Sequence, residues 1–200
     1  MFEELKKELE TLHGKRKQCK SCELNGNAFV TFSAEYTEGP CDILFIGINP
    51  GKCEAESGVP FTGRSGQLLR KMILEAGLSE YNLAFTNSML CSTKNQSVIM
   101  DSKTAVTNCS SLIDLIITKI DPKIIITLGT VPTKFLFYIH TPLLFNCGES
   151  HHISEISKPR LKGKPLITLA HPSALRFKGN KHLIEKCREG LNAAKSLLSV

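Results

Sequence analysis

The chain has 200 residues, of which 42% are hydrophobic, so it can bury one sizeable core and we expect a single domain over residues 1–200. A formal net charge of +6 suits a polyanionic partner without identifying one. The sequence has no signal-peptide core and no apolar run of the roughly 18 residues that a membrane span needs, which argues against a secreted or membrane-spanning protein. We therefore expect a soluble, cytoplasmic protein with no membrane partner.

The pattern of apolar residues predicts the fold class. Phe2, Leu5, Leu9 and Leu12 recur at three- and four-residue spacing, which predicts an amphipathic helix over residues 2–13. Uninterrupted apolar runs predict strands covered on both faces, at residues 42–48, 82–90, 123–129 and 165–170. Further helices are predicted at residues 65–78, 101–120, 131–137 and 181–198. This alternation favours an α/β fold, a three-layer α/β/α sandwich around a central four-stranded parallel sheet.

Polar and glycine-rich motifs follow three of these strands. GINPGKCEAESGVPFTG (residues 47–63) follows the first strand, the second ends in TNSML, and HPSALRFKGN follows the fourth. Ligand sites in open α/β sheets form outside the carboxyl ends of the strands, which meet at one edge. We therefore predict one cleft that contains the Gly/Pro loop, an asparagine and a histidine.

Four of the eight cysteines have a spacing that fits metal ligation. Cys19 and Cys22 form a C-x2-C pair, and Cys91 and Cys109 follow at longer intervals. Structural disulfides are not expected in a cytoplasmic protein. Four thiolates can hold a tetrahedral zinc ion or an iron–sulfur cluster, and the spacing alone does not separate the two.

Taken in order, these motifs resemble the iron–sulfur branch of the uracil-DNA glycosylase superfamily, often called family 4. The resemblance rests on CKSCEL, GINPG, PF-x-G-x-SG, TNSMLC, TLGT and HPSALR, and it covers about residues 16–177. It implies a monofunctional enzyme that excises uracil from DNA and leaves an abasic site. It also implies a structural [4Fe-4S] cluster, with the ligands Cys19, Cys22, Cys91 and Cys109.

The first motif departs from the family-4 pattern. That pattern reads GEAPG, with a glutamate in the second position, where this chain has Ile48. Asn49 occupies the third position, and GINPG resembles the mismatch-specific uracil glycosylases, in which this asparagine holds the attacking water. The chain thus resembles a family-4 scaffold with a mismatch-type first motif.

The resemblance implies roles for residues of the cleft. Asn49 and His171 would be catalytic, Asn49 by positioning water at the anomeric carbon and His171 by hydrogen-bonding O2 of the departing base. Phe61 would stack on the base, and Asn87 would read its Watson–Crick edge. The glycine-rich loop would complete the base pocket with Gly47, Ile48 and Glu54.

Two segments are expected to contact DNA. Ser65 lies between glycines at the start of a predicted helix, where backbone N–H groups bind phosphate. Leu175 and Phe177 would fill the gap left by an extruded base, and Ser173 and Arg176 would contact the DNA beside it. The expected partner is DNA that contains uracil or a related base, bound by a monomer.

Two alternative functions remain open. The first is a non-catalytic DNA-binding member of the same fold, in which loss of the motif glutamate leaves affinity without turnover. The second is a glycosylase specific for a hypermodified pyrimidine, with room beside Gly51 for a group on C5. A virus with unusual DNA would need such an enzyme in the host cytoplasm.

Overall fold

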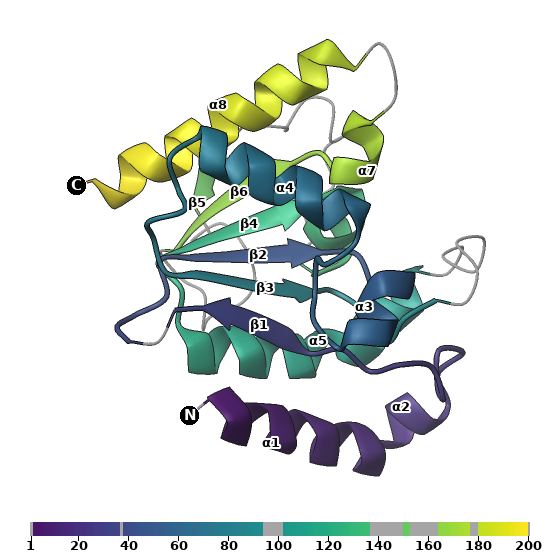
Figure 1. The fold of residues 1–200 in the computed structure, drawn as a ribbon. Coiled ribbons are helices and arrows are strands. Elements are labelled where there is room, and N and C mark those ends of the chain that lie inside the picture. Colours follow the sequence, from purple (N-terminus) through teal and green to yellow (C-terminus); the bar gives the residue numbers. More distant parts are fainter. Residues whose placement is uncertain are drawn as a thin grey trace.

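The computed structural model describes residues 2–36, 38–93, 102–136, 150–152, 164–176 and 180–199. Helices and strands alternate along much of this length (Figure 1). The strands are β1 (Phe32–Glu35), β2 (Ile43–Gly47), β3 (Leu83–Asn87), β4 (Ile124–Leu128), β5 (Ser150–His152) and β6 (Pro165–Leu169). The helices are α1 (Phe2–Lys15), α2 (Lys17–Lys20), α3 (Lys52–Ser57), α4 (Arg64–Glu75), α5 (Ser102–Ile120), the π-helical η2 (Pro132–Leu136), α7 (Pro172–Leu175) and α8 (Lys181–Leu198).

Four strands form the parallel centre of the sheet, in the order β3-β2-β4-β6. Every residue of β2, β3 and β4 is buried, which explains why their sequences are apolar without alternation. The predicted α/β fold is confirmed. The described part of the sheet also has an antiparallel strand at each edge, β1 beside β3 and β5 beside β6. The sequence analysis predicts neither edge strand.

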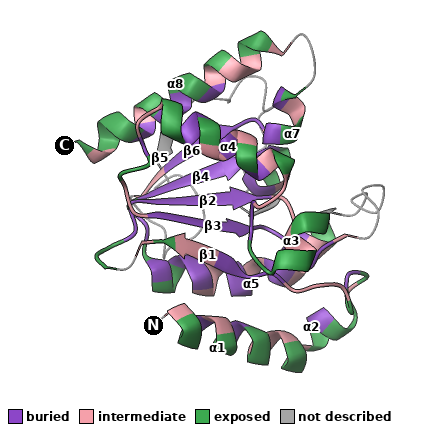
Figure 2. Ribbon diagram, viewed as in Figure 1, coloured by how far each residue is buried: buried purple, intermediate pink, exposed green. Residues whose placement is uncertain are grey.

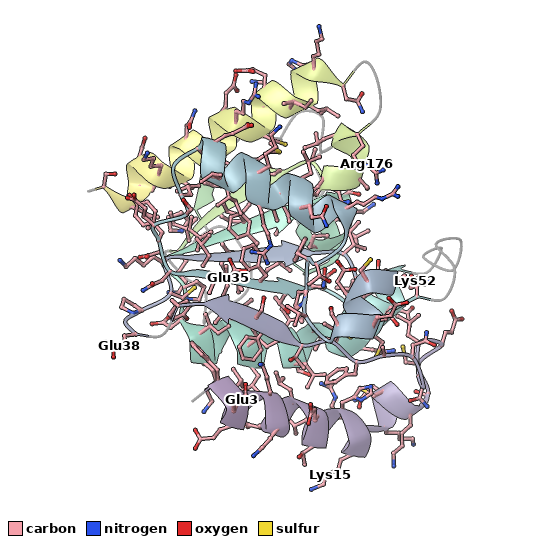
Figure 3. All side chains as sticks on the ribbon, in the orientation of Figure 1. Glu3, Lys15, Glu35, Glu38, Lys52 and Arg176 are labelled. Atoms are coloured by element: carbon pink, nitrogen blue, oxygen red, sulfur yellow. The ribbon has the colours of Figure 1, made fainter. Side chains whose placement is uncertain are left out.

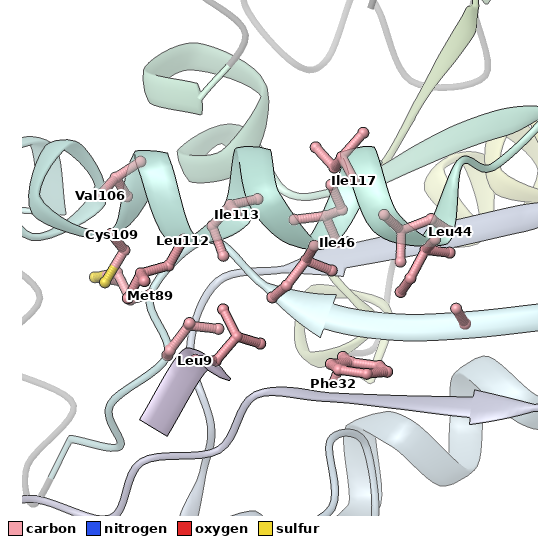
Figure 4. Close-up of a cluster of buried hydrophobic side chains, with 14 of the residues drawn as sticks. Leu9, Phe32, Leu44, Ile46, Met89, Val106, Cys109, Leu112, Ile113 and Ile117 are labelled. Carbon is pink, nitrogen blue, oxygen red and sulfur yellow. The ribbon is translucent and has the colours of Figure 1, made fainter. Parts of the chain in front are cut away.

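Helices cover both faces of the sheet. Helices α1 and α5 lie on one face, and α4 and α8 lie on the other (Figure 1). On the first face, Leu9 of α1 and Ile113 of α5 belong to the same buried cluster as Ile46 (Figure 4). On the second face, Leu69 of α4 belongs to one cluster with Phe85 of β3. The strands are buried between the layers, and the exposed residues lie on the outer sides of the helices (Figure 2).

Helix α4 starts one residue earlier than the sequence predicts. Its N-cap is Gly63, so Ser65 lies inside the first turn rather than at the cap. The helix ends before Gly77, whose φ of 67° lies in the left-handed region that glycine tolerates. The start of α4 therefore points its first backbone N–H groups toward the same end of the sheet as the GINPG loop.

The register between β2 and β3 brings two of the predicted motifs together. The strands pair in parallel up to Gly47 and Asn87, which lie opposite each other. Beyond this pair, the backbone N–H of Met89 donates to the carbonyl of Ile48 at 2.9 Å. The start of the GINPG loop is therefore fixed against the segment that follows β3.

Candidate active site

A cleft of about 820 Å³ opens at the carboxyl ends of β2, β3 and β6. All three strand-end motifs contribute to it, so Asn49, Asn87 and His171 face one cavity. Lys52 on α3 and Arg176 beside α7 lie at this end of the sheet (Figure 3). The lining residues are Ile48, Asn49, Gly51, Lys52, Glu54, Phe61, Ser65, Gly66, Asn87, Thr93, His171, Ser173 and Arg176.

Gly47 separates two of the predicted base-binding side chains. A Cβ atom at this position would lie 2.5 Å from Oδ1 of Asn87 and 2.6 Å from Cζ of Phe61. Both distances are too short for any side chain, so glycine is required here. The absence of a side chain lets the Asn87 amide and the Phe61 ring approach each other over the backbone of β2. Among the described residues, no hydrogen bond to the Asn87 amide is seen, which leaves its donor and acceptor available to a ligand.

Phe61 is held in an unusual backbone conformation. Its φ is 58°, in the left-handed region, and its ring packs on Phe85 with the centroids 5.8 Å apart. A Cβ atom on Gly66 would lie 1.9 Å from the carbonyl oxygen of Phe61, so α4 approaches this residue as closely as glycine allows. Only 6% of Phe61 is exposed, so the ring offers a narrow surface to the cleft. A non-glycine residue at positive φ costs about 1–3 kcal/mol, which the surrounding packing must offset.

The Asn49 amide has a defined orientation. Its Nδ2 donates to the carbonyl of Pro50 at 2.9 Å and to the hydroxyl of Thr93 at 3.0 Å. A carbonyl can only accept, so the contact with Pro50 decides which end of the amide is nitrogen. The Oδ1 of Asn49 accepts no hydrogen bond from a described residue. A free acceptor at the cleft is the arrangement needed to hold a water molecule.

Glu54 ties the two ends of the glycine-rich loop together. Its Oε2 accepts the backbone N–H of Gly51 at 3.0 Å, and its Oε1 accepts that of Gly63 at 2.7 Å. Both carboxylate oxygens are therefore engaged by the loop itself. The sequence predicts that Glu54 helps to form the base pocket, and Glu54 does line the cleft. In the structure this carboxylate also shapes the loop.

His171 follows β6 and caps the short helix α7. Its Nδ1 accepts the backbone N–H of Ser173 at 3.2 Å and lies 2.7 Å from the Ser173 hydroxyl. Burial lowers the pKa of His171 to about 4, so the ring is neutral at physiological pH. Because Nδ1 accepts, the single ring proton of the neutral form lies on Nε2. Nε2 is therefore a neutral hydrogen-bond donor in the cleft.

The residues expected to contact DNA fall into three groups. Ser65, Ser173 and Arg176 line the cleft. Leu175 is 6% exposed and belongs to the apolar cluster under α4 and α8, so it cannot act as an exposed wedge in this structure. This part of the sequence interpretation is wrong, because α7 turns Leu175 toward the core. Phe177 lies outside the described residues.

Thr93 lines the cleft and is missed by sequence reasoning. It comes two residues after Cys91, shortly after the predicted strand 82–90. That position could have marked it as a candidate, but its side chain belongs to no motif. Its contact with Asn49 joins residues 44 positions apart, and such a pair is visible only in three dimensions.

The four predicted ligand cysteines lie near one another, outside the lining of the cleft. Cys19 and Cys22 lie on and after α2, Cys91 follows β3, and Cys109 lies on α5. Burial and then the thiols of Cys109, Cys22 and Cys19 raise the pKa of Cys91 to about 12. Burial likewise raises the pKa of Cys109 to about 11, and the Cys19 and Cys22 thiols also raise it, whereas the Leu90 backbone and Arg16 act in the opposite direction. The four thiols are therefore close enough to influence one another.

This donor set fits an iron–sulfur cluster in its chemistry. Four thiols from three segments point to a soft metal centre, and bound iron would supply the positive charge that buried thiolates need. The Arg16 guanidinium donates to the carbonyl of Asn108 at 3.0 Å and adds a positive charge beside Cys19 and Cys109. Within the described ranges, no group of three or more His, Cys, Asp or Glu side chains is arranged to hold a metal ion as it stands.

Comparison with known protein families identifies the fold family. A model of the uracil DNA glycosylase superfamily matches residues 35–192, which is most of the chain. The chain belongs to the uracil-DNA glycosylase superfamily. The resemblance found in the sequence motifs is thereby confirmed.

Several relatives of the chain are named type-4 uracil-DNA glycosylases. A type-4 uracil-DNA glycosylase from Thermotoga maritima is 28% identical over 195 residues, which cover 95% of this chain and 94% of the relative. Another from Archaeoglobus fulgidus is 25% identical over 168 residues, or 80% of this chain and 79% of the relative. One from Sulfurisphaera tokodaii is 39% identical over 97 residues, which span 48% of this chain and only 43% of the relative.

None of the helices in the described ranges combines the length and the apolar character that crossing a bilayer requires.

Proposed function

We propose that this chain is a monofunctional DNA glycosylase that hydrolyses the N-glycosidic bond of uracil in DNA and leaves an abasic site. The observation that carries the proposal is the meeting of Asn49, Asn87 and His171 in one cleft. Membership of the superfamily supports the reaction class. The three side chains supply an acceptor for water, a reader of the base and a donor to the leaving group.

The cleft recognises the base after it leaves the DNA stack. Extrusion of a nucleotide costs a few kcal/mol, which contacts to the exposed base must offset. Asn87 gives an N–H to O4 of uracil and accepts N3–H, whereas cytosine presents the reverse pattern. Phe61 packs on the base, and Gly47 lets both side chains reach it.

His171 stabilises the leaving group. When the bond between C1′ and N1 breaks, its electron pair remains on uracil, and the negative charge spreads onto O2. The Nε2–H of neutral His171 donates a hydrogen bond to O2. Such a preorganised donor is worth about 3–4 kcal/mol where it has been measured in other enzymes. A neutral donor keeps its proton, so the uracil leaves as an anion.

Asn49 holds the water that attacks C1′. Its Oδ1 accepts one O–H of the water, which turns an oxygen lone pair toward the sugar. An amide is too weak a base to remove the proton, so the water attacks a centre that already has oxocarbenium character. The proton released afterwards goes to the departing uracil or to solvent. No lysine imine is needed, and Lys52 lies at the rim with its side chain 90% exposed.

The DNA backbone is bound around the rim of the cleft by a monomer. Ser65 and the backbone N–H groups at the start of α4 cradle one phosphate. Arg176 and Lys52 both line the cleft and supply positive charge to it.

A [4Fe-4S] cluster is the metal centre that we propose for Cys19, Cys22, Cys91 and Cys109. The type-4 name of the relatives and the four neighbouring thiols support it. When bound, it supplies a covalent link between α2, the segment after β3 and α5. We assign no step of the reaction to it.

The decisive experiment is cleavage of a uracil-containing oligonucleotide, read on a gel after alkali. We expect abasic product from uracil, and a fall of about 100-fold or more for His171→Ala and Asn49→Ala with DNA affinity retained. Persistent DNA binding without product would instead favour the non-catalytic alternative. Parallel substrates with hydroxymethyluracil, hypoxanthine and thymine test the base, since preference for a C5-substituted pyrimidine would overturn the assignment to uracil.

A further inference from the structure

We propose that Thr93 is a positioning residue for the reaction, because its hydroxyl fixes the Asn49 amide so that Oδ1 is presented to the attacking water. The inference rests on the proposed function for its catalytic consequence. The orientation of the amide itself is a separate, structural claim.

Both hydrogens of the Asn49 amide are donated within the protein. One is donated to Pro50 and the other to Thr93, so Nδ2 has no hydrogen left for a ligand. This leaves Oδ1 as the ligand-facing atom of Asn49. A second hydrogen bond also prevents the rotation of the amide that one contact alone would permit.

The two acceptors belong to different segments of the chain. Pro50 is the next residue in the chain, so its carbonyl moves with the loop that carries Asn49. Thr93 belongs to the segment after β3, so its hydroxyl does not move with the loop that carries Asn49. Of the two contacts, only that with Thr93 fixes the amide relative to Asn87, which holds the base.

The backbone near Thr93 is itself well anchored. The N–H of Ser92 donates to the carbonyl of Ala28 at 2.8 Å, and the Asn27 amide donates to the carbonyl of Ser92, also at 2.8 Å. Cys91 pairs with Phe29 in an antiparallel bridge. An anchored hydroxyl can fix an amide on a neighbouring loop, whereas a mobile one cannot.

The test compares Thr93→Val, which removes the hydroxyl at constant shape, with Thr93→Ser, which keeps it. Single-turnover excision of uracil is expected to fall about tenfold in Thr93→Val and to stay within about threefold in Thr93→Ser, with the Kd for DNA changed by less than about twofold in both. Thr118→Val, which removes an exposed hydroxyl on α5, is the matched control. A rate for Thr93→Val equal to that of the wild type would overturn the inference.

A double-mutant cycle separates positioning from general damage. If Thr93 acts through Asn49, Thr93→Val has no further effect on the rate in an Asn49→Ala background. An equal loss in both backgrounds would refute action through Asn49.

A third measurement does not depend on activity. The side-chain amide protons of Asn49, followed by NMR in the uncomplexed protein, should shift and exchange faster with solvent in Thr93→Val but not in Thr93→Ser. Unchanged amide signals would refute the structural claim. If the wild type excises no uracil, the proposed function fails, and the amide signals still decide the role of Thr93.

Discussion

Ile48 and His171 both lie against Gly129, although they come from the ends of different strands. A Cβ atom on Gly129 would lie 3.1 Å from Cβ of His171 and 3.5 Å from Cδ1 of Ile48. His171 and Ile48 thus lie near each other at the cleft, and Ile48 stands at the position where the family-4 motif carries a glutamate. Burial disfavours the imidazolium, in line with the low pKa of His171.

Replacing Ile48 by glutamate should therefore raise the pKa of His171. A carboxylate close to the ring favours its charged form and offsets part of the burial effect. The pKa is measured by NMR titration of the imidazole in Ile48→Glu and the wild type, with Ile48→Leu as the apolar control. An upward shift from about 4 in the glutamate variant alone is the expected result. Equal pKa values in all three proteins would contradict this account.

The low pKa of His171 also predicts the pH dependence of activity. The ring stays neutral until the pH approaches about 4. We therefore expect that protonation of His171 causes no fall in the excision rate near the ordinary histidine pKa of 6.5. Single-turnover rates between pH 5 and 8 test this expectation. A rate that falls tenfold per pH unit below 6.5 in the wild type, and not in His171→Gln, would show that His171 titrates normally.

The same pKa has a consequence for stability. The folded pKa is depressed below the unfolded value, so the unfolded chain binds a proton that the folded chain does not bind. The contribution of neutral His171 is present above pH 6.5 and is lost as the pH falls from 6.5 toward about 4. Urea unfolding of His171→Gln should show a shallower loss of stability over this window. Equal slopes in the two proteins would contradict this account.

Much of this architecture follows from the sequence because its signals are local. Each parallel strand is buried on both faces, so an uninterrupted apolar run such as residues 43–47 marks it directly. Parallel strands place their carboxyl ends at one edge, which is enough to predict that Asn49, Asn87 and His171 meet. The parallel arrangement of the four central strands follows from the same alternation.

The features that sequence reasoning misses depend on long-range contacts. The edge strand β1 is four residues long and only its first residue is fully buried, so it has no apolar run. Leu175 stands among basic residues and looks exposed, but its place on α7 turns it into the core. The sequence motif predicts that the Glu54 carboxylate faces a ligand, although both of its oxygens accept hydrogen bonds from the loop.

Gly47→Ala should damage both stability and base recognition. The new methyl group would overlap Oδ1 of Asn87 and Cζ of Phe61, and crowding of this kind costs about 1–3 kcal/mol. We expect a lower urea midpoint and a weaker affinity for uracil-containing DNA. Gly14→Ala on α1 is the matched control, because nothing lies within 4 Å of its Cβ position, and the change should stabilise the helix by about 0.5–1 kcal/mol. If Gly47→Ala is as stable as the wild type, Asn87 and Phe61 do not pack tightly against Gly47.

Glu54→Gln should loosen the glycine-rich loop. Glutamine can accept only one of the two N–H groups well, because its NH2 end would face the other donor. We expect a loss of about 1–2 kcal/mol in the free energy of unfolding and faster amide exchange at Gly51 and Gly63. Glu56→Gln, on the exposed side of α3, is the control and should change neither. If amide exchange at both glycines stays unchanged in Glu54→Gln, the carboxylate does not hold the loop.

Cys91 joins the proposed metal centre to the cleft, since Thr93 follows it by two residues and contacts Asn49. Cys91→Ser should lower the iron and acid-labile sulfide bound per chain, because a serine hydroxyl is a poor ligand for iron. It should also release the segment that carries Thr93, so the Asn49 amide protons exchange faster. The exposed Cys53→Ser variant should keep its iron and sulfide. If the wild type contains zinc and no acid-labile sulfide, the centre is a zinc site and not an iron–sulfur cluster. If Cys91→Ser loses iron while the Asn49 signals stay unchanged, the two sites are independent.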